Sequence, residues 1–299
     1  MSERKSSRGR KRTLTNNFRH NCDFTVTPDM KQKFDDYGYI IVRGLLDKEE
    51  LELINQAIAS PDGVLKHRYS LDDPEGRPLG RVIWTHPGND ITGVLARSEK
   101  VAGTSEQLLG GEVYHYHSKL LLKDAETGGR HMWHQDYGYW YHNGCLRPDM
   151  LTVFIPIDRC VKENGCLQIL PGSHKYGRIE HVRKGIQEEA DLSRVEAIKQ
   201  QTSLIYVEMD PGDAVFFHCN ILHTSGPNNS NLRRWAFLTA YNKATNNPIK
   251  KHHHACYTPL IKVSNDAIRK CTVFNDLSGK EFIIPGTNSY IIKPTEEQQ

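Results

Sequence analysis

The chain has 299 residues, 37% of them hydrophobic and 25% charged, with a net charge of +3. This composition supports one domain with a sizeable core, and it excludes a membrane protein, because no apolar run approaches the ~18 residues that a membrane span needs. The sequence also lacks a charged-then-apolar secretory leader, so we expect an intracellular, cytoplasmic protein.

The net charge conceals a basic N-terminal tail. Residues 1–20 hold seven Lys or Arg and one Glu, so they carry +6 and the remainder carries −3. Because apolar residues at helical spacing are missing there, we predict a disordered tail over residues 1–24 and a single domain over residues 25–299. A nuclear-localisation signal at Arg8 to Arg12 is the alternative interpretation of the tail. Nucleic-acid binding is not expected, because the rest of the chain is mildly acidic.

The seven cysteines are odd in number and contain no C-x-x-C pair, which favours reduced thiols over a disulfide framework. A reducing compartment also keeps iron ferrous. The sequence does not set the oligomeric state.

Helices come first along the chain. Thr27-Pro28-Asp29 is typical of a helix start, and this helix should end before Gly38. A short strand follows at residues 39–42. Asp47 and Glu50 form a predicted capping box for a second helix. Residues 61–95 are rich in Pro, Gly and Asp and are predicted to be mostly loop, and a third helix is expected over residues 98–109.

Strands dominate the second half. The β-rich runs are separated by turn signals, and they cover residues 112–123, 150–157, 166–170, 204–207, 214–217 and 235–241. Asn164-Gly165 between two of them predicts a hairpin. Helices followed by many short strands indicate a mainly β fold with flanking helices, a double-stranded β-helix or jelly roll of the cupin kind. The segment from Lys250 is irregular and is expected to wrap the barrel.

The H-x-D pair His134 and Asp136, with His223 further along, predicts a metal site. Side chains two apart in an extended segment point the same way, so both could bind one ion. Two imidazoles and one carboxylate on one face of an octahedral ion leave the opposite face free, as in non-haem Fe(II) oxygenases. His218 is the rival distal ligand.

Arg234, eleven residues after His223, completes this pattern. An oxygenase of this kind needs a co-substrate as electron source, and the distal carboxylate of 2-oxoglutarate suits a guanidinium fork. The sequence therefore predicts Fe(II), 2-oxoglutarate and O₂ together.

Four motifs in this order resemble the phytanoyl-CoA dioxygenase family of Fe(II)/2-oxoglutarate oxygenases, nearest its ectoine-hydroxylase-like branch. They are WHQD at 133–136, NGCLQILPGSH at 164–174, PGD at 211–213, and HTSGPN from His223 through Arg234. The resemblance covers most of residues 27–245. It implies that His134, Asp136 and His223 bind iron and that Arg234 holds 2-oxoglutarate.

The resemblance implies further contacts with the co-substrate. The residues that match such positions are Ser225, Thr152, Lys123 and Trp140. It also implies hydroxylation of a small molecule with release of succinate and CO₂. An amino acid or its derivative is favoured over an acyl-CoA, because aromatic side chains beside a lysine suit a compact zwitterion.

Substrate-binding candidates are His117, Lys119, Tyr137 and Tyr139. The first two replace a Gln-Ser-Arg stretch of the ectoine branch, which argues against ectoine itself. An ordinary solvated lysine beside a core-edge histidine is the alternative there. The run His252-His253-His254 is interpreted as a polar flanking loop, because consecutive side chains point different ways.

Three rival functions remain open. One is another outcome at the same iron, although Asp136 argues against halogenation. The second is a catalytically silent barrel that binds a metabolite or partner. The third is a protein hydroxylase, which the basic tail suggests and the position of Arg234 disfavours.

Overall fold

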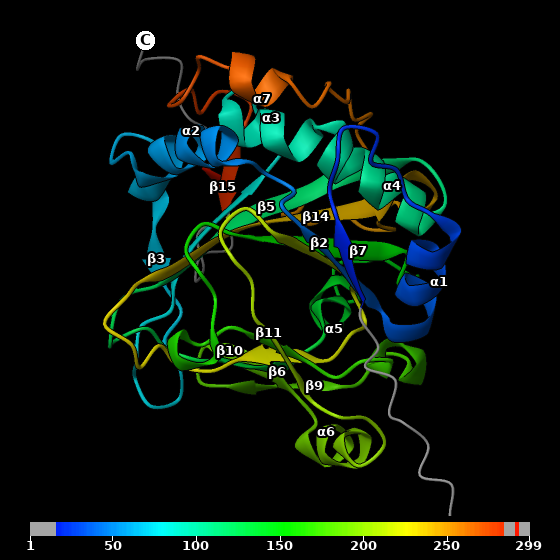
Figure 1. The fold of residues 1–299 in the computed structure, drawn as a ribbon. Coiled ribbons are helices and arrows are strands. Elements are labelled where there is room, and N and C mark those ends of the chain that lie inside the picture. The colour runs from blue at the N-terminus through cyan, green and yellow to red at the C-terminus, as the bar shows by residue number, and fades with distance from the viewer. Residues whose placement is uncertain (1–15, 284–290, 293–299) are drawn as a thin grey trace, which may run out of the picture.

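The computed structural model describes residues 16–283 and 291–292 of the chain. Helices cover one face of a large mixed sheet, a smaller sheet lies opposite its other face, and α6 lies beyond that smaller sheet (Figure 1). This is the expected mainly β jelly roll with flanking helices.

The first two helices begin and end where the sequence predicts. α1, Pro28–Tyr37, is capped by the Thr27 side chain and ends at Gly38, which adopts a left-handed φ of 78° that favours glycine. α2, Lys48–Ala59, has the full capping box between Asp47 and Glu50.

The region 61–95 is more ordered than predicted. Its elements are η1 (Val64–His67), β3 (Tyr69–Ser70), β4 (Gly80–Thr85) and the start of α3 (Ile91–Arg97). β4 was missed because Val82, Ile83 and Trp84 are consecutive apolar residues, so its side chains show no polar alternation. α3, which Asp90 caps, was missed and ends at Ser98, whose backbone is extended. The helix predicted over residues 98–109 is confirmed as a π-helical turn at Glu99–Gly103 that continues into α4, Thr104–Leu109.

The large sheet runs in the order β1-β2-β12-β7-β14-β5-β4-β15-β16, and β3 joins it beside β4. The strands not yet given are β1 (Asn17–Arg19), β2 (Tyr39–Arg43), β5 (Val113–Lys123), β7 (Met150–Pro156), β12 (Ala214–His218), β14 (Arg234–Lys243), β15 (Glu281–Ile283) and β16 (Ile291–Ile292). β1 pairs with β2 in parallel, so ordered structure begins before the boundary expected at residue 24. Residues 1–15 of the predicted tail lie outside the described residues.

The smaller sheet has the order β11-β8-β13-β6. Its strands are β6 (His131–His134), β8 (Leu167–Ile169), β11 (Ile205–Val207) and β13 (His223–Ser225), and a separate hairpin pairs β9 (His181–Lys184) with β10 (Gln187–Ala190). The predicted hairpin at Asn164-Gly165 is wrong. Those residues end a 3₁₀ turn (η3, Lys162–Asn164) where the chain crosses from β7 to the other sheet, because β8 pairs with β11 and β13.

The strands of the large sheet bury both faces. Leu120, Leu122 and Phe237 pack against the helices, whereas Leu121 and Leu238 point toward the smaller sheet and share a core with its β8 residues. The alternate residues on that inner face therefore line the space between the two sheets.

The remaining elements are short. They are α5 (Asp136–Trp140), η4 (Ser173–Tyr176), α6 (Leu192–Lys199), η5 (Ala244–Asn246) and α7 (Ala267–Lys270). Residues 250–266 contain no regular helix and the chain then returns to pair β15 with β4, so the C-terminal region packs on the barrel as predicted. None of the described helices has the length and apolar character that a bilayer span requires.

Candidate metal centre

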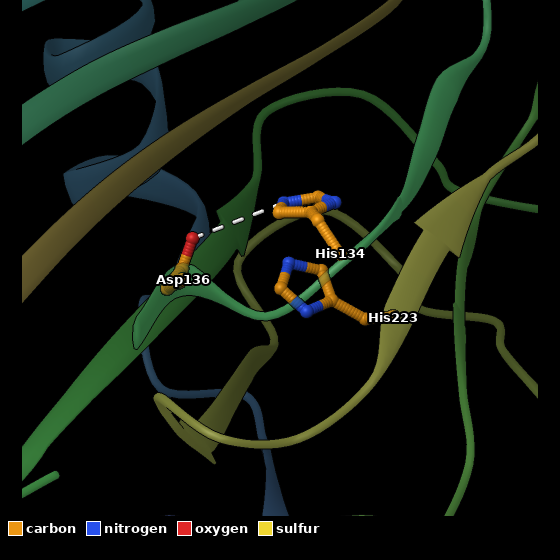
Figure 2. A group of neighbouring side chains, drawn as sticks. All are labelled: His134, Asp136 and His223. Carbon is orange, nitrogen blue, oxygen red and sulfur yellow. Dashed lines mark ion pairs between the residues drawn. The ribbon is translucent and has the colours of Figure 1, made fainter. Parts of the chain in front are cut away.

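His134, Asp136 and His223 meet between the two sheets. His134 ends β6 directly opposite His223 in β13, and Asp136 begins α5 two residues further on. One ligand atom from each lies within 4.8 Å of the others, and all three side chains are buried. Figure 2 shows the two imidazoles and the carboxylate pointing toward one another. His134 and Asp136 converge although only the histidine lies in a strand.

The two histidines are oriented for metal binding through Nε2. Nδ1 of His134 lies 2.7 Å from the Met132 carbonyl oxygen, and Nδ1 of His223 lies 3.0 Å from that of Ile221. A carbonyl only accepts, so each Nδ1 carries the proton and each Nε2 keeps its lone pair. Burial lowers the pKa of both rings below the ordinary value, which keeps them neutral.

Gln135 fixes the backbone between the two ligands. The nitrogen of its side-chain amide donates to the backbone carbonyls of Gly177 and Asn220, and the oxygen of that side chain accepts from the Ile179 N–H. The Gln135 N–H donates to Nε2 of His181 at 2.9 Å. Hydrogen bonds therefore hold both the backbone N–H and the side-chain amide of the residue between the two metal ligands.

Asp136 is held by its own neighbours. Thr152, on β7, donates a hydrogen bond of 2.6 Å to Oδ2. Oδ1 lies 3.9 Å from Nε2 of His134 and 3.9 Å from Nζ of Lys119. Thr152 thus positions a metal ligand, and its predicted contact with 2-oxoglutarate stays a prediction.

Arg234 lies at the inner end of the site, fully buried at the start of β14. Nη2 donates to the Gly165 carbonyl at 2.8 Å, whereas Nε and Nη1 are buried and have no hydrogen-bond partner among the described residues. A narrow cavity of about 20 Å³ joins this guanidinium to His134 and His223, with Ser225 and Lys119 also on its wall. A diacid that binds here has to displace neighbouring side chains.

Lys123 stands directly opposite Arg234 in the pairing of β5 with β14. Its buried ammonium donates to Ser225 Oγ at 2.8 Å and to the Gly226 carbonyl. Burial, and then the charge of Arg234, lower the pKa of Lys123 well below its usual range. No carboxylate of the described residues forms an ion pair with either group, so this end of the site favours an anion.

An outer cavity of about 360 Å³ opens on the other side of His134 and Asp136. Four of the predicted substrate or co-substrate residues line it: His117, Lys119, Tyr139 and Trp140. Trp140, predicted to contact 2-oxoglutarate, therefore lines the outer cavity and not the narrow cavity beside Arg234. Tyr137 packs elsewhere, with its hydroxyl donating to the Cys145 carbonyl.

Sequence reasoning missed several residues of this outer cavity. They are Arg81, Glu188, His253 and His254. Arg81 was missed because the sequence predicts a loop where β4 lies. His254 lies in an irregular segment, as predicted, but it is half-buried and lines the cavity, and nothing in a run of three histidines indicates which ring turns inward.

The rival ligand His218 lies elsewhere. Its ring packs against His174, with ring centroids 5.2 Å apart. Over residues 16–283, the one group whose ligand atoms converge is the predicted triad.

This geometry suits ferrous iron and 2-oxoglutarate. Two neutral imidazoles and a carboxylate form the facial set typical of such iron sites, and the partnerless edge of Arg234 suits a carboxylate.

The sequence model of the phytanoyl-CoA dioxygenase family matches residues 34–236. The chain belongs to this family. It is 34% identical over 241 residues to an L-proline trans-4-hydroxylase from Streptomyces griseoviridis, covering 74% of this chain and 88% of that protein. An ectoine dioxygenase from Stutzerimonas stutzeri is 25% identical over 236 residues, or 74% and 78% of the two chains.

The fold is likewise that of solved family structures. EctD from S. alaskensis, crystallised with 2-oxoglutarate and 5-hydroxyectoine, superposes with a TM-score of 0.69 and 20% identity, covering 82% of this chain and 90% of that one. The predictions of a dioxygenase of this family, near its ectoine-hydroxylase-like branch, and of the jelly-roll fold are thereby confirmed.

Proposed function

We propose that this protein is an Fe(II)- and 2-oxoglutarate-dependent hydroxylase of a small amino acid or amino-acid derivative, which releases succinate and CO₂. The observation that carries the proposal is the pairing of the His134–Asp136–His223 triad with a buried guanidinium whose Nε and Nη1 have no partner among the described residues. When bound, iron and 2-oxoglutarate supply the oxidising chemistry with O₂, and the protein supplies position and shielding.

The chain's own residues then have distinct tasks. His134 and His223 would hold iron through Nε2, and Asp136 through Oδ1, since Thr152 occupies Oδ2. Arg234 would hold the distal carboxylate of 2-oxoglutarate, with the amine of Lys123 beside it. Ser225 lines the same cavity and is proposed to contact the acid.

The outer cavity supports a compact substrate. A volume of about 360 Å³ lies at the lower end of the range for small-molecule sites, which favours an amino acid over an acyl-CoA. Its walls carry the cationic side chains of Arg81 and Lys119 as well as the anionic Glu188, so both ends of a zwitterion find opposite charges. The relatives named for L-proline and ectoine agree with this size class.

Formation of succinate from 2-oxoglutarate, measured with a panel of amino acids and betaines that begins with L-proline, tests the proposal. We expect one member to stimulate succinate release, and Asp136→Ala to abolish it. Asp149→Ala is the matched control, because Asp149 pairs with Arg147 near the surface. Succinate formation that survives in Asp136→Ala contradicts the proposal. Iron and 2-oxoglutarate binding without any succinate supports the silent-barrel alternative.

A further inference from the structure

Four aromatic rings cluster at the substrate cavity, and three of them, His117, Trp140 and His254, line it. His254 stacks on His117 with ring centroids 4.9 Å apart and lies 4.7 Å from the Tyr116 ring. Trp140 meets both Tyr116 and His117 edge-on, at 5.3 and 5.6 Å. We call Tyr116, His117, Trp140 and His254 the aromatic box. It joins β5 and α5 to the C-terminal segment.

Two nitrogens of the aromatic box have no partner. Nδ1 of His117 and Nδ1 of His254 are buried, and neither forms a hydrogen bond with the described residues. A buried polar atom is costly to leave unsatisfied, so a bound molecule that supplies a hydrogen bond gains affinity here. Burial also lowers the pKa of both rings well below the ordinary value, so each is a neutral imidazole that has an N–H to donate.

The charge beside the aromatic box decides which group it accepts. Lys119 lies two residues after His117 on the same strand face, and it lines the same cavity. An ammonium with two imidazole donors suits a carboxylate. Glu188, the acidic residue of the cavity wall besides the metal ligand Asp136, lies on β10 rather than on β5 and suits the other end of a zwitterion.

We propose that His254 and His117, together with Lys119, bind the carboxylate of the substrate, and that the C-terminal segment thereby sets substrate specificity. This inference rests on the proposed function, because it concerns the substrate of the same site. His254 lies beyond residues 34–236, where the family's sequence model matches, so it is a determinant that the shared core of the family does not supply.

Ligand titration without turnover tests the proposal directly. Under anaerobic conditions, with Fe(II) and 2-oxoglutarate present, tryptophan fluorescence follows binding of L-proline, L-lysine and glycine betaine, each compared with its carboxamide. Trp140 is a suitable reporter because its ring contacts His117. His254→Phe keeps a stacking ring and removes both nitrogens. His67→Phe makes the same change at a ring that stacks on Phe282 and lies outside the cavity lining.

We expect wild-type protein to prefer at least one carboxylate over its carboxamide by tenfold or more. His254→Phe should weaken binding of that carboxylate at least tenfold and leave the carboxamide within twofold, whereas His67→Phe should match the wild type. A wild-type protein that prefers no carboxylate overturns the proposal, as does His254→Phe that weakens acid and amide equally. If one of these two results is found while the wild type releases succinate normally, the inference about the aromatic box is refuted and the proposed function is not. The proposed function fails separately if Asp136→Ala still forms succinate.

Discussion

Thr152 donates a hydrogen bond of 2.6 Å to Oδ2 of Asp136 from the neighbouring strand β7. Both groups are buried, so water does not compete for this bond. It leaves Oδ1 as the oxygen that faces His134. The hydroxyl thus selects which carboxylate oxygen is available to a metal, although Thr152 itself is not a ligand.

Thr152→Val removes this hydroxyl at nearly constant volume. We expect the affinity for Fe(II), measured by anaerobic titration, to fall about 10- to 100-fold, as is usual when a partner of a metal ligand is lost. Thr85→Val is the matched control, because the buried Thr85 hydroxyl has no partner among the described residues. Equal metal affinity in both variants would show that Thr152 does not position Asp136.

Arg234→Lys keeps the positive charge and removes the planar fork. Each hydrogen bond to a charged group contributes about 1.5–3 kcal/mol, so losing one should raise the KM for 2-oxoglutarate roughly 10- to 150-fold. Arg233→Lys is the control, since Arg233 pairs with Asp158 outside the cavity. An unchanged KM in Arg234→Lys is incompatible with the assigned role.

Gly138→Ala should disturb the centre through His181. A Cβ at Gly138 would lie 2.2 Å from the His181 ring, whose Nε2 accepts from the Gln135 N–H. We expect a loss of about 1–3 kcal/mol in the free energy of unfolding, measured in urea, together with weaker Fe(II) binding. At Gly226 an added Cβ would meet only ordinary contact at 3.5 Å, so Gly226→Ala should keep wild-type stability. Equal stability of the two variants would speak against the close approach.

Stability should decrease below neutral pH. Burial, reinforced by His174 and Lys31, lowers the pKa of His218 to about 3. Above pH 6.5, the unfolded value, His218 is neutral in both the folded and the unfolded state. As the pH falls from 6.5 toward 3, the unfolded chain takes up a proton that the folded protein does not, so the free energy of unfolding decreases. The slope is about 1.4 kcal/mol per pH unit for each such histidine.

His218→Asn retains an acceptor for the Asn220 N–H and removes the titrating group. The free energy of unfolding, measured in urea between pH 6.5 and 5, should therefore fall less steeply in this variant. Parallel pH profiles for the variant and the wild type would refute the assignment.

The sequence predicted those parts of the fold whose signals are local. Thr27, Gly38, Asp47 and Glu50 act through hydrogen bonds within a few residues, so the ends of α1 and the start of α2 were confirmed. β4 was missed because its short run of consecutive apolar residues shows no polar alternation. The crossing at Asn164-Gly165 was mistaken for a hairpin, since a turn motif does not indicate which strand pairs next.

The candidate site shows the same division. The spacing of His134, Asp136 and His223 identified a group that the structure brings together. The substrate cavity was predicted only in part, because Arg81 and His254 reach it through tertiary packing. His254 approaches His117 across more than 130 residues of chain, and no short-range pattern encodes that contact.

The most direct test of the account is the visible absorption of the anaerobic protein when 2-oxoglutarate is added to its Fe(II) form. Chelation of ferrous iron by the 2-oxo acid produces a charge-transfer band, so the wild type should develop the band and saturate. Arg234→Lys should require a much higher concentration of 2-oxoglutarate, and Asp136→Ala should lack the band. Absence of the band in the wild type, or an unchanged band in Asp136→Ala, would contradict the claim that this triad and Arg234 together form the iron and 2-oxoglutarate site.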